Sequence, residues 1–455
     1  MEVRTGDYKM SSANSAAHRV ILAWLITIAL LTLAVVGALR HGMFVPTDYG
    51  TWRGDWHAVS ECLSQGRSQA CQGVSKFPLA YLANSTWAGS ADGRGQQMLS
   101  IVNAVCLLLP LLALFLAQGA RVLFQAGWAY VAAIALSPLP MFYVATGAIE
   151  IQSAVFCGLY IGAFARTLAS PGLKADSATT WLLAISGFIF PLYKDTIAGF
   201  MGFAMVVLVG AYRSSLLELA RTPEGRGRLV RIALVAAVPV MFSQILAGAY
   251  CWFKYGVPLP LAYMDEAKMA SPGFRKSTEF LFGSLFSPNG GVLIFWGLAV
   301  FVAVMGWRAV GLVPRRQVVV GALALFVICC VAYAHWWATF GWDSWGNRLM
   351  VPASFATLVA ALLCLRPRTP AEMERAAAPV VLAYAPLLVG SAYYVLMPYA
   401  MHAPEPLRNS LWYGPACARM RDAMSTEAIA QGLAFWKGDA YYQCARERML
   451  HVPGP

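Results

Sequence analysis

The sequence predicts an all-α polytopic membrane protein with about 11 transmembrane helices, because it is strongly apolar and its apolar residues come in long continuous runs. Hydrophobic residues make up 59% of the chain, charged residues only 12%, and the mean hydropathy is +0.58. A run of about 20 apolar residues crosses the hydrocarbon core of a bilayer as a helix. Continuous runs do not fit the alternating strands of a transmembrane barrel, so a helical bundle is expected.

The apolar runs give the expected helices in chain order. No small-residue cleavage site follows the first run, so we expect a retained anchor rather than a signal peptide. The fifth and sixth runs are separated only at Tyr193-Lys194-Asp195. The expected helices lie near residues 20–39, 98–117, 126–146, 149–165, 179–195, 196–212, 231–253, 288–307, 318–338, 349–365 and 378–398.

The distribution of Lys and Arg predicts the orientation of the chain. These residues gather in alternate loops, and the positive-inside rule then puts residues 1–19 in the cytoplasm. Residues 20–398 form one membrane domain, whose loops 40–97 and 254–287 lie outside the cytoplasm together with the tail, 399–455. About half of the net charge of +12 serves this topology, and no soluble basic domain remains, so nucleic acid is not an expected partner.

The ten cysteines divide according to this topology. Cys62 and Cys71 fall in the first outside loop, and Cys417 and Cys444 fall in the outside tail, so we expect two local disulfides in an oxidising compartment. The other six fall in predicted spans, where a thiol behaves as a small buried hydrophobe. No cysteine spacing matches a zinc site. These six are Cys106, Cys157, Cys251, Cys329, Cys330 and Cys364.

The ionisable residues next to the spans fall at the outside ends of the helices. A transporter is expected to place such groups near the middle of the bilayer, on interrupted helices. A cluster at the surface instead indicates chemistry at the membrane boundary. The residues are Asp48, Asp55, Glu150, Lys194, Asp195, His335, Asp343 and Arg348.

Three short motifs then occur in order along the chain. They are Tyr-Gly-x-Pro at Tyr255–Pro258, Phe-Ser-Pro-x-x-Gly at Phe286–Gly291 and Trp-Gly-x-Arg at Trp345–Arg348, after an aspartate that follows the first helix. With these motifs the chain resembles the GT-C superfamily of membrane glycosyltransferases, from roughly residue 45 to residue 365. It departs from the pattern at Gly341-Trp342-Asp343, where many relatives have two glycines. The resemblance implies a bacterial inner-membrane enzyme, inverting stereochemistry, a polyprenyl-phosphate sugar as donor, and no metal or other cofactor.

Sugar transfer to a hydroxyl needs a base for the acceptor proton and cations for the departing phosphate. Asp48 or Asp55 is the expected base. Asp48 is preferred because it lies nearest the helix exit, although a helix cap also explains it. Arg348 and Lys194 are expected at the phosphate, although Arg348 also fits a snorkelling arginine.

Four further residues are candidates for binding the substrates. Glu150 is expected at a sugar or acceptor hydroxyl, with a helix-start acid as the alternative explanation. His335 and Asp343 either bind substrate or stabilise the Trp-rich outside loop. The resemblance adds Tyr255 to this set.

The expected activity is transfer of a hexose or pentose, such as mannose or arabinose, to an envelope glycan, a lipid or an exported protein such as a pilin. Two other classes remain open. A polyprenyl-linked sugar flippase or other transporter has similar composition but does not need a long first outside loop. An O-antigen ligase or polysaccharide polymerase uses a diphosphate donor, and its main outside loop is expected later in the chain.

Overall fold

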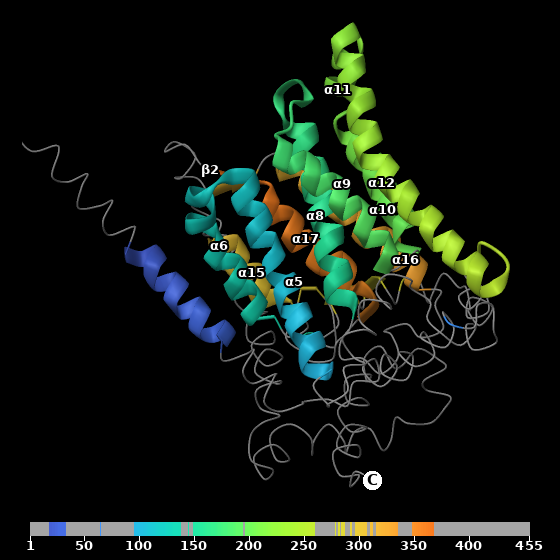
Figure 1. Cartoon of the computed structure of the whole chain (residues 1–455). Helices are drawn as coiled ribbons and strands as arrows, with labels where there is room; N and C mark the ends of the chain where they lie inside the picture. The colour runs from blue at the N-terminus through green and yellow to red at the C-terminus, as the bar shows by residue number, and fades with distance from the viewer. Residues whose placement is uncertain are drawn as a thin grey trace, which may run out of the picture.

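The computed structural model describes residues 18–32, 64, 95–137, 144, 149–193, 196–259, 315–334 and 348–367, together with short stretches between residues 278 and 312. This part of the chain is a helical bundle (Figure 1). Its elements are helix His18–Thr32, α5 (Gly95–Gln118), α6 (Ala120–Ala135), α8 (Ile149–Ala169), η1 (Pro171–Leu173), α9 (Ser177–Tyr193), α10 (Thr196–Ala211), α11 (Arg213–Ala220), α12 (Pro223–Tyr255), α15 (Gly297–Gly306), β1 (Val310–Leu312), α16 (Arg315–Tyr333), η3 (Arg348–Met350), α17 (Val351–Leu363) and β2 (Leu365–Pro367).

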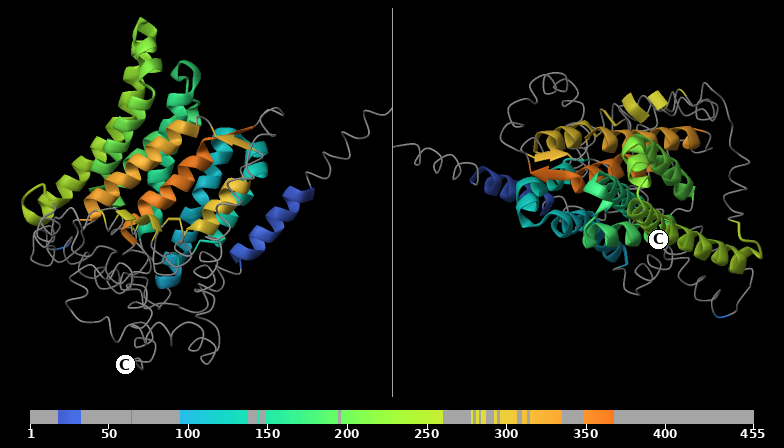
Figure 2. Two further views of the ribbon diagram at one scale, coloured as in Figure 1. Left: turned by 180° about the vertical axis from the view of Figure 1, so that it is seen from behind. Right: turned by 90° about the horizontal axis from the view of Figure 1, so that it is seen from above.

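Helices α8 and α17 form the centre of the bundle. Both contribute to the two large apolar cores, of which one continues into α5, α6 and α15 and the other into α9, α10 and α16. In the most apolar stretch of α8, 89% of the residues are buried, whereas in that of α12 only 11% are buried. Figure 2 shows helix His18–Thr32 and α12 at opposite edges of the bundle.

Three of the described helices are long and apolar enough to cross a membrane: Met98–Gln118 in α5, all of α8, and Pro223–Phe253 in α12. The bent pair α10 and α11, at 72°, makes a fourth if it is one span. Large apolar side chains along α12 remain exposed, for example Val238, Met241 and Ile245. A soluble domain does not leave so many uncovered, so these faces fit contact with lipid.

Several helix boundaries differ from those predicted. Helix α6 ends at Ala135 rather than near residue 146, because Pro138 follows and the residue before a proline disfavours helix. Helix α12 begins at Pro223 rather than 231, since the Thr222 hydroxyl caps it by accepting a hydrogen bond from the Gly225 N–H at 3.1 Å. Helix α11 lies where a loop was expected.

One short β-ribbon modifies the expected all-α fold. β1 pairs antiparallel with β2, with Gly311 opposite Arg366. β1 lies in the connection between α15 and α16, and β2 directly follows α17. The ribbon therefore brings these two segments together at one end of the bundle. That end also carries α11, as Figure 1 shows.

The six cysteines expected inside spans are free and buried, as predicted. Cys364 lies at the end of α17, and its Sγ is 3.6 Å from the Gly162 carbonyl oxygen of α8. Cys330 Sγ on α16 lies 4.0 Å from Met350 Sδ at the start of α17. These thiols therefore contribute to packing between helices.

Candidate active site at one end of the bundle

A group of polar side chains is buried where α8 begins. Glu150, in the first turn of α8, is only 6% exposed. Gln152 and Ser153 follow it on the same helix and are buried as well. Burial of polar and ionisable groups among apolar helices is costly, so such a group is a functional-site candidate by default.

Helix α5 supplies the facing polar residues. The Gln152 side-chain amide donates a hydrogen bond to Asn103 Oδ1 at 2.7 Å, and both residues are almost fully buried. At the other end of the same two helices, Arg166 Nη2 donates to the Ala117 carbonyl oxygen at 2.7 Å. The two residues of each of these hydrogen bonds are 49 positions apart in the sequence. Helices α5 and α8 are therefore parallel and in register, and Glu150 lies between the levels of Ser100 and Asn103.

Helix α6 brings a further hydroxyl to this level. The one-residue connection at Gly119 turns α6 back along α5, and the Tyr130 hydroxyl donates to the Leu107 carbonyl oxygen at 3.0 Å. Ser137, two residues after the end of α6, lies about level with Ser100, and both are buried. Three helices thus contribute polar side chains to one end of the bundle.

Two glycines set how α17 packs on α8. A Cβ on Gly158 would lie 2.5 Å from Val359 Cβ and 2.7 Å from the Ala356 carbonyl oxygen. One turn on, a Cβ on Gly162 would lie 3.0 Å from Ala360 Cα. The spacing is the Gly-x-x-x-Gly pattern that lets two membrane helices approach closely, here in parallel.

This parallel packing brings Arg348 to the level of Glu150. Glu150 lies about two turns before Gly158 on α8. Arg348, the first residue of η3, lies about two turns before Ala356, which packs against Gly158. The first turn of α8 therefore lies at about the level of η3, just before α17 begins. The start of a helix carries a positive partial charge, so the starts of α8 and α17 are electrostatically favourable for an anion.

The predicted site residues divide into two groups. Glu150 and the backbone of Arg348 lie at the same end of the bundle, at about the same level along α8 and α17. Tyr255 does not join them, because α12 packs on α9 and carries Tyr255 about two turns beyond the level where α9 ends, at the edge of the bundle (Figure 1). The predicted residues that lie outside the described part of the chain are Asp48, Asp55, Lys194, His335, Asp343, Cys62, Cys71, Cys417 and Cys444.

Asn103 and Gln152 were not among the residues predicted from the sequence. The predicted residues were mainly charged groups at helix ends, whereas these two are uncharged polar residues within apolar helices. An asparagine inside the run 98–117 and a glutamine two residues after Glu150 were nevertheless visible signals, because neither side chain gains from contact with lipid.

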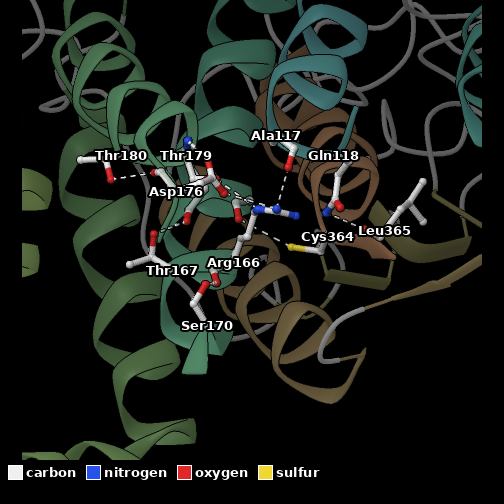
Figure 3. Close-up of polar contacts among 12 residues, drawn as sticks. Ala117, Gln118, Arg166, Thr167, Ser170, Asp176, Thr179, Thr180, Cys364 and Leu365 are labelled. Carbon is white, nitrogen blue, oxygen red and sulfur yellow. Dashed lines mark hydrogen bonds and ion pairs between the residues drawn. The ribbon is translucent and has the colours of Figure 1, made fainter. Parts of the chain in front are cut away.

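At the opposite end of the bundle, Arg166 on α8 forms polar contacts with the neighbouring helices (Figure 3). Its guanidinium donates to the Thr179 hydroxyl at 3.1 Å and lies 3.4 Å from Asp176. Asp176 caps α9, since its Oδ1 accepts the Thr179 N–H at 2.7 Å. Partial burial alone raises the pKa of Asp176, but the hydrogen bonds from Thr179 and the Arg166 charge outweigh it, so the pKa is lowered. These contacts tie α5, α8 and α9 together.

Comparison of the chain with family models, with curated proteins and with solved structures gives no match.

Proposed function

We propose that this protein is a membrane glycosyltransferase that moves a sugar from a polyprenyl-phosphate donor to an acceptor hydroxyl. The observation that supports it best is the burial of Glu150 in the first turn of α8, at the same end of the bundle as the buried Asn103–Gln152 hydrogen bond. The proposal keeps the expected topology of about eleven spans in a bacterial inner membrane, with the site outside the cytoplasm.

The polar side chains suit recognition of a sugar. A sugar presents many hydroxyls, and sites that hydrogen-bond a hydroxyl discriminate strongly because their buried polar groups are otherwise left without partners. Glu150 accepts hydrogen bonds, while the Gln152 amide both donates and accepts. We assign Glu150 to a hydroxyl of the sugar or of the acceptor.

The two helix starts suit the phosphate of the donor. Backbone N–H groups and the positive ends of α8 and α17 favour an anion, and a guanidinium binds phosphate oxygens with two parallel hydrogen bonds. We assign Arg348 to this phosphate, with Lys194 as a second cation. Asp48 or Asp55 acts as the base that takes the proton of the acceptor hydroxyl while its oxygen displaces the donor phosphate from the sugar carbon. This single displacement inverts the configuration at that carbon, and the polyprenyl phosphate leaves.

The depth of the polar residues favours this reaction over transport. Asn103 lies about five residues, or about 7.5 Å, inside the apolar stretch that starts at Met98. The middle of a bilayer lies about 15 Å from its boundary. Asn103 thus lies about midway between the boundary and the midplane. Glu150, which lies between the levels of Ser100 and Asn103, is nearer the boundary, where a lipid-linked sugar head group lies, than the midplane, where transporters bind their substrates.

The test is sugar transfer by the purified full-length protein in proteoliposomes, with labelled polyprenyl-phosphate mannose or arabinose as donor and a cell-envelope extract as acceptor. Glu150→Gln is expected to lower transfer about 10- to 100-fold, the effect of losing one charged hydrogen bond. Glu218→Gln, at an exposed position on α11, is the matched control and should transfer normally.

Asp48→Asn and Asp55→Asn identify the base, since its loss is expected to lower transfer about 10²- to 10⁴-fold. Movement of the lipid donor across the bilayer with no glycosidic bond formed contradicts the proposal and favours a flippase. Transfer by Glu150→Gln equal to that by Glu218→Gln removes Glu150 from the site.

A further inference from the structure

A pocket lies at the opposite end of the bundle from Glu150. Its volume is about 300 Å³, and it is enclosed by the end of α8, η1, the start of α9 and the first turns of α12. Three cations line it: Lys174, Arg228 and Arg231. We propose that this pocket binds the phosphate head group of an anionic phospholipid.

The structure holds one of the three cations in place. Arg228 donates through Nη1 to the Gly172 carbonyl oxygen at 2.9 Å and pairs through Nη2 with Glu224, one turn earlier on α12. Gly172 has a φ of 59°, and a Cβ there would lie 2.8 Å from Arg228 Nη1. The arginine is therefore fixed against a turn that favours glycine.

Lys174 and Arg231 carry the charge that is available to a ligand. Among the residues that the structure describes, neither forms an ion pair, and both are exposed at the pocket mouth. The threonine hydroxyls at the pocket, on Thr167 and Thr180, already donate to the Ala163 and Asp176 carbonyl oxygens. The pocket therefore offers cationic donors to an anion rather than free hydroxyl donors.

The apolar part of the lining identifies the anion as a lipid. Ile232 and Val235 of α12 form part of the wall, and the adjoining face of α12 exposes Val230 and Leu234. A soluble phosphate ion gains nothing from contact with apolar side chains, whereas the acyl chains of a phospholipid bury apolar surface against them.

The position of the pocket along α12 also favours a lipid as its ligand. Arg231 is the last basic residue before about 22 mainly apolar residues, a length of about 33 Å that matches the hydrocarbon core. The pocket therefore lies at the membrane boundary, at the end of the bundle where Lys and Arg predict the cytoplasm. Basic pockets between membrane helices on that side bind acidic lipid head groups.

The experiment uses the full-length protein in nanodiscs of phosphatidylcholine with phosphatidylglycerol, and native mass spectrometry counts the phosphatidylglycerol retained on release. The variant Lys174→Gln/Arg231→Gln removes two cations that make no described ion pair, so the fold is preserved. At about fivefold per cation, its affinity for phosphatidylglycerol is expected to fall about 30-fold. The control Arg213→Gln/Arg221→Gln removes two exposed cations of α11 and its C-cap that do not line the pocket, and should retain the lipid.

Thermal unfolding in detergent separates the lipid from a free anion. Phosphatidylglycerol is expected to raise the melting temperature of the wild type and of the control, and to have a much smaller effect on the double variant. Equal retention by the double variant and the control overturns the proposal. Stabilisation by inorganic phosphate as strong as that by phosphatidylglycerol also overturns it, because the apolar wall then contributes nothing.

Discussion

Replacing Gly158 with alanine tests the close packing of α8 on α17, which sets the level of Arg348 against Glu150. The added Cβ would lie 2.5 Å from Val359 Cβ and 2.7 Å from a backbone oxygen of Ala356. Carbon atoms in contact prefer about 3.5–4.0 Å, so the helices must separate by about 1 Å at this point. Neither neighbour is the flexible end of a long side chain, so local adjustment cannot absorb the clash.

The magnitude follows from two opposing effects. Overpacking of this kind costs about 1–3 kcal/mol. Alanine also favours helix over glycine by up to about 1 kcal/mol. Gly202→Ala on α10 isolates the clash, because a Cβ there meets no atom within 4 Å and the helix preference is the same. We expect Gly158→Ala to be about 1–3 kcal/mol less stable than Gly202→Ala.

The assay is reversible unfolding in mixed micelles of mild detergent and dodecyl sulfate, followed by far-ultraviolet circular dichroism. The difference between the two variants corresponds to about 5- to 200-fold in the unfolding equilibrium constant. Sugar transfer by Gly158→Ala should also fall, since the separation moves Arg348 away from Glu150. Equal stability of the two variants would falsify the tight α8–α17 contact and the register inferred from it.

Three further predictions concern single contacts. Asn103→Leu and Gln152→Leu should each destabilise the protein, because each removes one partner of a buried hydrogen bond. In a double-mutant unfolding cycle, the double variant should be less destabilised than the sum of the two single variants, with a coupling energy of about 0.6–1.7 kcal/mol. Additive effects of the two substitutions would refute the hydrogen bond. The pKa of Asp176 is lowered from 3.8, so its charge stabilises the fold above that pH and the gain is lost as pH falls below it. Thermal melts of wild type and Asp176→Asn should therefore converge in acid and differ at pH 7, and a constant difference contradicts this. Cys62 and Cys71 are predicted to be disulfide-bonded, so a membrane-impermeant maleimide should label them only after reduction; labelling without reduction excludes the bond.

The sequence was sufficient to predict the helical architecture, because apolar runs of span length are a direct physical requirement of a bilayer. The break between α9 and α10 after Tyr193 also lies where it was predicted. Helix ends were less predictable where local chemistry extended a helix beyond its apolar run. The Thr222 cap and Pro223 start α12 two turns before its hydrophobic part begins.

The arrangement of the candidate site needed the structure. Parallel α5, α8 and α17 are far apart in sequence, and nothing in a single chain indicates which three helices share a register. The signal was present in Gly158 and Gly162, but a glycine pair inside an apolar run does not reveal its partner. The Asn103–Gln152 bond could not be predicted for the same reason, since each residue alone looks like an isolated polar interruption.

Photocrosslinking can show whether the lipid-linked donor binds at the end of the bundle that carries Glu150 and Arg348. A polyprenyl-phosphate sugar with a photoreactive group on the sugar is added to the full-length protein, and the modified peptides are mapped by mass spectrometry. Crosslinks are expected in the first turns of α8 and from η3 to the start of α17, and unmodified donor should abolish them. Crosslinks that concentrate instead around α11 and the start of α12, at the opposite end, would contradict it.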